Sequence, residues 1–188
     1  MSDAIRVLGV SGSLRKGSFN SAILRAAIEL VPAGMTLETA EIRDIPLYDE
    51  DVRAEGLPPS VQRLRDQIKA ADALLFATPE YNYSVSGVLK NAIDWASRPP
   101  SQPFAGKPFA VMGASSGMGG TMRAQYHLRQ MAVFLDMHPV NKPECFVREA
   151  AKKIENGKLT DEATRKVIGD LLVALASWTR RLRSGSGS

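Results

Sequence analysis

Three polar loops hold the side chains that are best suited to binding a small ligand, and the first of them follows a short apolar run. Its sequence, VSGSLRKGSFNSAIL at residues 10–24, combines glycines, hydroxyl groups, an amide and two cations. Glycines let the backbone approach an anion closely, and the N–H groups at the start of a helix attract it. Hydroxyl and guanidinium groups add hydrogen bonds that suit a terminal phosphate. The side chains that could bind it are Ser11, Ser13, Arg15, Ser18 and Asn20.

Two familiar phosphate-binding loops do not fit this stretch. The loop that binds nucleoside triphosphates requires a lysine after its second glycine, but Ser18 follows Gly17 directly. The glycine spacing of a dinucleotide-binding loop is also missing, with a serine at position 11 and an arginine at position 15. Taken alone, the stretch predicts either a phosphate site of another kind or a serine-rich cap of the following helix.

The second and third loops carry groups that suit a planar ring. Tyr81 and Tyr83 offer flat faces with polar tips, and the amide of Asn82 between them can bind the edge of a heterocycle. Residues 114–125, ASSGMGGTMRAQ, form a Gly/Ser loop that could close over the same ligand. For the second loop, the alternative is a turn whose tyrosines pack on the next helix. A phosphate pocket beside a ring pocket matches flavin mononucleotide (FMN), and a single phosphate loop argues against a dinucleotide.

The elements that must position these loops alternate between strands and helices. Apolar or alternating runs predict strands at residues 4–10, 35–42, 71–79, 107–115 and 137–140, the last resuming near 144–147. Helical spacing predicts helices at 19–31, 88–97 and 161–182. It also predicts a helix that begins after the prolines at 58 and 59, and another that ends at about residue 134. A long loop is expected at 43–59. This alternation predicts an α/β fold, a flavodoxin-like, doubly wound, five-stranded parallel sheet with helices on both faces. All three loops would then lie at the carboxyl edge of the sheet, where such folds bind ligands.

Length and composition limit the class of protein. The 188 residues suit one domain, which we expect to span 1–182, followed by a flexible tail at 183–188. The net charge of +4 is scattered and no nucleic-acid-binding motif accompanies it, so no nucleic-acid partner is expected. No apolar run reaches the roughly 18 residues that cross a membrane, and no signal peptide is visible, so we expect no membrane association and a cytoplasmic location. The single cysteine, Cys145, fits a reducing compartment.

Three segments together resemble the NADPH-dependent FMN reductase family, and within it the chromate and quinone reductase branch. They are GSLRKGSFN at 12–20, PEYNYSVSGVLKNAIDW at 79–95 and GKPFAVMGASSGMGG at 106–120. The resemblance implies a bound FMN, with NAD(P)H as the hydride donor. It also implies that the FMN phosphate is bound by Ser13, Arg15, Ser18, Phe19 and Asn20. The flavin ring would be bordered by Pro79, Glu80, Tyr81, Asn82, Tyr83, Ser115, Ser116 and Gly117.

The resemblance further implies a homodimer or homotetramer, in which a side-chain network joins the subunits near the flavin. The matching positions are Tyr83, Arg123, Tyr126 and Glu144. Arg123 and Glu144 could instead form an ordinary surface ion pair, which would contribute little.

No side chain is expected to act as a catalytic acid or base, because a flavin carries the redox chemistry itself. We expect a ping-pong cycle in which NAD(P)H and then a small-molecule acceptor use the same flavin face. Candidate acceptors are quinones, chromate, azo and nitro compounds and free flavins. Arg123 and Arg98 are expected to attract the NAD(P)H phosphates or an oxyanion. His127 and His138 are too few for a metal site, so no metal is expected, and Cys145 lacks an activating partner.

Two other functions remain open from the sequence. A flavodoxin-like electron carrier or sensor would bind FMN without oxidising NAD(P)H. Such carriers are typically acidic, whereas this chain is basic and carries Arg15 in its first loop, which favours the reductase. The same pocket could also hold a different nucleotide.

Overall fold

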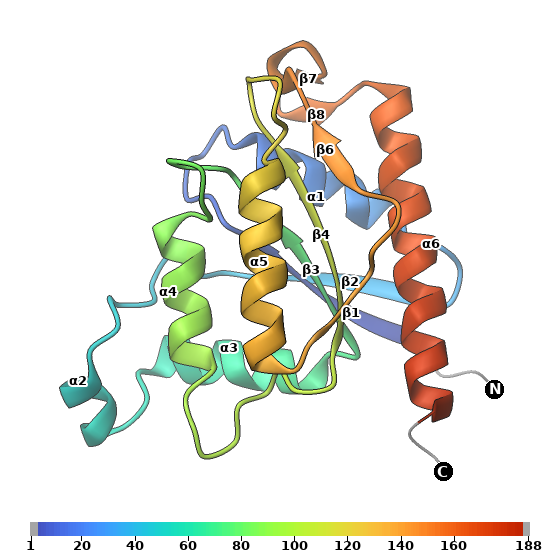
Figure 1. Cartoon of the computed structure of the whole chain (residues 1–188). Helices are drawn as coiled ribbons and strands as arrows, with labels where there is room; N and C mark the ends of the chain where they lie inside the picture. The colour runs from blue at the N-terminus through green and yellow to red at the C-terminus, as the bar shows by residue number, and fades with distance from the viewer. Residues whose placement is uncertain (1–3, 186–188) are drawn as a thin grey trace.

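A parallel sheet forms the centre of the molecule in the computed structural model, which describes residues 4–185 (Figure 1). The strand order is β2-β1-β3-β4-β5, and β6 also pairs with β4. This is the order of flavodoxin-like doubly wound sheets, so the predicted fold class is confirmed. The strands are β1 (Ile5–Ser11), β2 (Met35–Ala40), β3 (Ala73–Ala77), β4 (Pro108–Ala114), β5 (His138–Pro139) and β6 (Cys145–Val147). The predicted interruption of the last strand is confirmed, because β5 and β6 pair with successive parts of β4.

Helices cover both faces of the sheet. One face packs against α1 (Phe19–Glu29) and α6 (Glu162–Gly185), which contribute buried residues such as Ile23 and Leu172. The other face packs against α3 (Pro59–Ala70), α4 (Gly87–Ala96) and α5 (Met122–Leu135), through residues such as Ile68 and Leu128. The central strands are apolar on both sides because both of their faces are covered, as in β3, where all five residues are buried. Within residues 4–185, no helix is long and apolar enough to cross a membrane.

Three local elements differ from the sequence expectations. The long loop at 43–59 contains a short helix, α2 (Glu50–Glu55), which buries none of its residues and lies apart from the sheet at the lower left of Figure 1. A 3-10 turn at Ala150–Lys152 and a small hairpin, β7 (Ile154–Glu155) and β8 (Lys158–Leu159), precede α6. The expected tail from 183 is wrong at its start, because α6 continues to Gly185. The rest of that tail, residues 186–188, lies outside the described residues.

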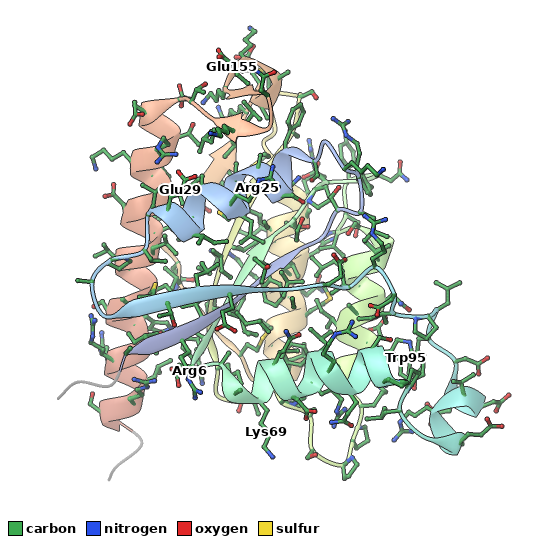
Figure 2. The ribbon with its side chains drawn as sticks, turned by 180° about the vertical axis from the view of Figure 1, so that it is seen from behind. Arg6, Arg25, Glu29, Lys69, Trp95 and Glu155 are labelled. Carbon is green, nitrogen blue, oxygen red and sulfur yellow. The ribbon has the colours of Figure 1, made fainter. Side chains whose placement is uncertain are left out.

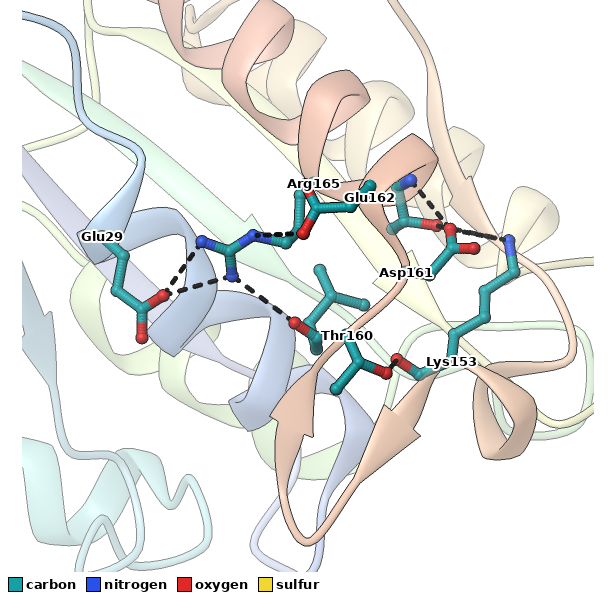
Figure 3. A network of polar contacts seen from close by, with 8 residues as sticks. Glu29, Lys153, Thr160, Asp161, Glu162 and Arg165 are labelled. Carbon is teal, nitrogen blue, oxygen red and sulfur yellow. Dashed lines mark hydrogen bonds and ion pairs between the residues drawn. The ribbon is translucent and has the colours of Figure 1, made fainter.

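A polar network fixes the start of α6 (Figure 3). Asp161 accepts a hydrogen bond of 2.8 Å from the backbone N–H of Thr164, which caps the first turn of the helix. Arg165 on α6 pairs with Glu29 on α1 at 3.1 Å, so the two helices on this face are joined directly. Lys153, next to the hairpin, pairs with Asp161 at 3.6 Å.

The other end of α6 is fixed at Asp72, just before β3. Arg183 pairs with the Asp72 carboxylate at 2.7 Å, and the backbone N–H of Arg6 donates to the same group at 2.7 Å. Burial acts to raise the pKa of Asp72, but the Arg6 N–H and the Arg183 guanidinium outweigh burial and lower it. The charged carboxylate therefore holds the last helix against the start of the sheet.

Candidate functional site

The first loop joins β1 to α1 and contains a helix cap. Ser18 has an extended backbone, and its hydroxyl accepts from the N–H of Ser21 at 3.2 Å. The hydroxyls of Ser11 and Ser21 share a hydrogen bond of 3.0 Å. The capping alternative is therefore correct for Ser18. It does not exclude ligand binding, because Ser18 also lines the cavity described below.

Arg15 is folded back over its own loop. Its guanidinium donates to the carbonyl of Gly17 at 2.9 Å and lies 5.4 Å from the centre of the Phe19 ring. Among the described residues it makes no ion pair with a carboxylate. Its charge is therefore available to an anionic ligand, since a guanidinium has five N–H donors and one carbonyl engages only part of them.

Asn20 joins the first loop to the third. Its amide nitrogen donates to the carbonyl of Ala114 at 3.0 Å, and its amide oxygen accepts from the N–H of Ala114 at 2.9 Å. The side chain is buried, so these two bonds fix α1 against the end of β4. The sequence shows an amide in the first loop but contains no sign that Ala114 is its partner.

The second loop follows β3 and forms a two-residue hairpin turn. Tyr81 and Ser84 exchange two backbone hydrogen bonds of 3.0 Å, and both residues between them have a left-handed backbone, Asn82 at φ 51° and Tyr83 at φ 63°. Both tyrosine rings are exposed. The turn in that alternative is therefore confirmed, whereas the packing of its tyrosines on the next helix is wrong.

Arg123, in the first turn of α5, lies against the second loop. Its guanidinium is 3.9 Å from the centre of the Tyr83 ring, which is a cation–π contact. It also pairs with Glu80 at 2.9 Å. The Glu80 carboxylate further accepts from the backbone N–H groups of Arg123 at 2.9 Å and Ala124 at 3.2 Å, where the start of α5 favours a negative charge. Glu80 therefore positions the second loop against α5.

Glu144 does not pair with Arg123 in this chain. Its carboxylate binds Lys142 at 2.9 Å and accepts from the hydroxyl of Tyr126 at 2.9 Å. The hydrogen bond to Glu144 raises the pKa of Tyr126, and the bonds from Lys142 and Tyr126 lower the pKa of Glu144. The alternative of an ion pair between Arg123 and Glu144 is therefore wrong within one chain, and the four positions form two separate clusters.

The third loop leaves β4 in a crowded environment. A Cβ atom on Gly113 would lie 1.9 Å from the hydroxyl of Thr121 and 2.4 Å from the carbonyl of Thr78, so only glycine fits there. Thr121, a β-branched residue, has a left-handed backbone with φ 68°, which is a strained conformation for this side chain. The N–H of Ser115 donates to the carbonyl of Val147 at 3.1 Å, which ties the loop to β6.

Ser86 is a site residue that the sequence analysis missed. Its buried hydroxyl donates to the carbonyl of Gly12 at 2.6 Å and accepts from the N–H of Leu89 at 3.3 Å. It therefore caps α4 and ties the second loop to the first. A serine immediately before an apolar helix is a recognisable capping signal, but its contact with Gly12 is not visible in the sequence.

The three loops enclose one cavity of about 230 Å³ at the carboxyl ends of β1, β3 and β4. Its walls are formed by Ser13, Arg15, Ser18, Phe19, Asn20, Pro79, Glu80, Tyr81, Ala114, Ser115 and Ser116. Most of the residues assigned to a cofactor from the sequence are thus brought together. Asn82, Tyr83 and Gly117 lie within two residues of a wall residue in the chain but do not line the cavity.

Several other candidate residues lie outside this cavity. Arg98 is at the far end of α4, about 15 Å along a ten-residue helix from the second loop, so its expected role at the site is wrong. His127 shares a hydrogen bond of 2.9 Å with Ser84 on the exposed surface.

Burial raises the pKa of Cys145 to about 12, which makes the thiol unreactive. In the part of the chain that the structure describes, no group of three His, Cys, Asp or Glu side chains could hold a metal.

Comparison with known proteins points to one enzyme family. The family model for NADPH-dependent FMN reductases matches residues 5–152. An NAD(P)H-dependent FMN reductase of Pseudomonas aeruginosa is 64% identical over 184 residues, which cover 97% of this chain and 100% of that protein. A quinone reductase of Escherichia coli strain K12 is 45% identical over 187 residues, covering 97% of this chain and 100% of that protein.

A solved structure supports the same relationship. The flavoenzyme FerB, an NAD(P)H:(acceptor) oxidoreductase from Paracoccus denitrificans, matches this chain with a TM-score of 0.86 at 36% identity, covering 94% of this chain and 98% of that one. The family match spans all three loops around the cavity and the strands that position them. The chain therefore belongs to the NADPH-dependent FMN reductase family.

Proposed function

We propose that this protein oxidises NAD(P)H and passes the electrons to a quinone through FMN bound among the three loops. The observation that carries this proposal is the cavity that the loops form together. Its walls include Arg15 on the first loop, which pairs with no carboxylate among the described residues, and the exposed Tyr81 ring on the second loop. A ligand with a phosphate at one end and a planar ring at the other matches this arrangement.

The first loop fits the phosphate of FMN. Ser13 and Ser18 supply hydroxyls, and Arg15 supplies positive charge. The N–H groups of Phe19 and Asn20, in the first turn of α1, have no carbonyl partner within the helix and point toward its N-terminal end. Asn20 contributes by this backbone group and by holding the loop in place, since its side chain is bonded to Ala114.

The second and third loops fit the two sides of a flavin ring. Pro79, Glu80 and Tyr81 line one wall of the cavity, and Ser115 and Ser116 line another. Bound FMN would supply hydride acceptance from NAD(P)H and two-electron transfer to the acceptor, so the protein needs no acid or base side chain. The residues of this chain bind and orient the ring and leave one face open to both substrates in turn.

Among the candidate acceptors, we favour quinones, because the Escherichia coli relative is named a quinone reductase. The net reaction converts NAD(P)H, a proton and a quinone into NAD(P)⁺ and a hydroquinone. Chromate, azo and nitro compounds and free flavins are further candidate acceptors. Arg123 lies beside the cavity and is partly exposed, so it can attract an anionic acceptor or a phosphate of NAD(P)H.

We also infer that the protein is a homodimer or homotetramer and works in the cytoplasm. The support for the oligomer is an apolar patch on α5, where Val133 is 83% exposed and Phe134 is 85% exposed. Adjacent large apolar side chains with this exposure are typical of contact surfaces. The same helix carries Arg123 and Tyr126, so a contact along α5 would bring a second copy close to the site. A lone cysteine suits the reducing cytoplasm.

Reduction under anaerobic conditions tests the proposed function. Purified protein is expected to contain FMN and to lose its visible flavin absorbance when NADPH or NADH is added, then to regain it on addition of a quinone. Initial rates at several fixed quinone concentrations should give parallel reciprocal plots, as a ping-pong cycle requires. Bound FMN that neither nicotinamide reduces would contradict the reductase and favour a carrier or sensor. Protein that binds no FMN would favour another nucleotide.

A further inference from the structure

A second cavity, of about 390 Å³, lies on the other side of the first loop, between α1 and the carboxyl ends of β1 and β2. Its walls are formed by Ser11, Ser13, Arg15, Lys16, Ser21, Leu24, Arg25, Thr39, Ala40, Glu41 and Arg43. Ser13 and Arg15 also line the first cavity, so the two cavities adjoin each other at the first loop. The proposed FMN site does not use the other wall residues.

The second cavity is strongly cationic. Arg15, Lys16, Arg25 and Arg43 face it from the first loop, from α1 and from the segment after β2. Among the described residues, none of these four side chains makes an ion pair with a carboxylate. A concave surface that gathers unpaired charges of one sign concentrates ligands of the opposite sign.

The one acidic wall residue, Glu41, forms an ion pair with none of these four cations among the described residues. The Glu41 carboxylate accepts hydrogen bonds from the backbone N–H groups of Ile42 at 3.2 Å and Arg43 at 3.0 Å. It is thus turned toward the backbone at the end of β2. Its charge is bonded to neutral amides, and the guanidinium of Arg43 donates to the carbonyl of Leu14 instead.

Backbone carbonyls hold the arginines in place. Arg25 donates to the carbonyl of Gly157 at 3.0 Å, and Arg15 donates to that of Gly17 at 2.9 Å. Each guanidinium keeps further N–H donors for a ligand. The hydroxyls of Ser21 and Thr39 add neutral hydrogen-bonding groups to the same walls. Several fixed guanidinium groups with hydroxyls between them are the donor set that phosphate oxygens require.

We propose that the second cavity binds a phosphate monoester that is separate from the phosphate of FMN. FMN has one phosphate, which the first cavity accommodates, so the cations beyond the first loop serve another ligand. Two sources have this chemistry: the 2′-phosphate of NADPH, and a free phosphate compound. The assignment to NADPH rests on the proposed function. Binding of its 2′-phosphate in the second cavity would make the enzyme prefer NADPH over NADH. The second source does not depend on the proposed function.

The test uses the FMN-loaded protein and two single variants, Lys16→Gln and Arg25→Gln, whose side chains line only the second cavity. Lys69→Gln is the control. Figure 2 shows Lys69 on α3 and Arg25 on α1, and these two helices cover opposite faces of the sheet. Calorimetry would measure the binding of 2′,5′-ADP, which carries the 2′-phosphate, and of inorganic phosphate. Steady-state kinetics would compare kcat/KM for NADPH and NADH.

Each variant is expected to weaken 2′,5′-ADP binding about tenfold, as expected for the loss of one charge-assisted hydrogen bond, while the control binds normally. If NADPH is the source, kcat/KM for NADPH also falls about tenfold and that for NADH does not change. If a free phosphate compound is the source, binding of both probes weakens, whereas the kinetics with both nicotinamides are unchanged.

Two results would overturn the proposal: no binding of either probe to the wild-type protein, or binding that neither variant weakens. Protein that binds the probes but is reduced by neither nicotinamide would contradict the proposed function and leave the second cavity supported. FMN affinity, measured in the same variants, should not change. A loss of FMN affinity would mean that the two cavities are one site, and would also overturn the proposal.

Discussion

Tyr83 has a backbone conformation that residues with a side chain normally avoid. Its φ of 63° lies in the left-handed region, where glycine is favoured in a two-residue hairpin turn. The ring is nevertheless held 3.9 Å from the Arg123 guanidinium, beside the cavity. Strain of this kind persists where the surroundings enforce it, and it is common at binding sites.

We therefore predict that Tyr83→Gly is more stable than Tyr83→Ala by about 1 kcal/mol, because alanine at a positive φ is strained. Both variants lose the tyrosine ring, so the difference isolates the backbone. Denaturant unfolding would measure the two free energies. A Tyr83→Ala protein that is the more stable of the two would contradict the left-handed turn.

Arg15 provides the second prediction at the level of single residues. Arg15→Ala should raise the Kd for FMN by about tenfold or more, because a hydrogen bond to a charged group contributes roughly 1.5–3 kcal/mol. Riboflavin lacks the phosphate, so its Kd should stay unchanged and serves as the control ligand. Fluorescence quenching of each flavin would measure both constants. An unchanged Kd for FMN would remove the phosphate assignment from the first loop.

The sequence predicted which residue types line the site but not the contacts that hold them. Arg15 and Ser18 are recognisable because a cation and a hydroxyl suit a phosphate wherever the loop places them. By contrast, Asn20 is bonded to Ala114, and Glu80 is bonded to the start of α5. Those bonds depend on how β4 and α5 approach the loops. A single sequence does not contain that information.

At the level of elements, Gly113 lets β4 lie close against Thr121 and the carbonyl of Thr78. Gly113→Ala should lower the free energy of unfolding by about 1–3 kcal/mol, because its Cβ would lie 1.9 Å from the Thr121 hydroxyl. Gly169→Ala, in the interior of α6 with open space around it, is the matched control and should raise it by roughly 0.5–1 kcal/mol. Thermal and denaturant unfolding would measure both. A Gly113→Ala protein as stable as the wild type would contradict the crowded third loop.

The start of α6 depends on Asp161. Hydrogen bonds from the side chain and backbone of Thr164 lower the pKa of Asp161 below its ordinary value of 3.8. A carboxyl group with a lowered pKa stabilises the fold above its unfolded-state pKa, and this contribution is lost as the pH falls through the folded-state pKa. Asp161→Ala should therefore reduce stability by about 1 kcal/mol at neutral pH, with a smaller difference from the wild type below pH 3.8.

Asp161→Asn is the control for this prediction, because an amide oxygen caps a helix without a charge. It should keep most of the stability at neutral pH. Urea unfolding at neutral and acidic pH would compare the three proteins. An equal loss from Asp161→Ala at both pH values would show that the capping group does not titrate in this range.

Long elements with a buried apolar face were predicted from the sequence, and short exposed ones were not. The strands of the central sheet other than β5, and the helices that cover it, bury apolar residues at a regular spacing, which the sequence records. The helix α2 buries nothing, and β7 and β8 have two residues each, so they leave no periodic pattern. Their positions follow from caps and tertiary contacts, such as the contact of Arg25 with Gly157.

For the whole molecule, the apolar patch on α5 predicts self-association. The double variant Val133→Ser and Phe134→Ser should shift the protein to a smaller assembly in light scattering and sedimentation. Both side chains are largely exposed in the single chain, so its fold should not be affected. Val173→Ser, on α6 and 55% exposed, is the control and should leave the assembly unchanged. A monomeric wild-type protein, or a variant of unchanged mass, would contradict the inferred oligomer.

The ion pair between Arg183 and Asp72 has a practical consequence for protein engineering. It places the end of α6 beside the start of β3, and the Arg6 N–H that binds the same carboxylate places the start of β1 there too. The first strand and the last helix thus meet at the amino edge of the sheet, and the loops that form the cavity lie at the carboxyl edge (Figure 1). Residues 4 and 185, where the described chain begins and ends, therefore lie on the side of a single chain that faces away from the cavity, which favours attaching fusion partners or surface linkers beyond them.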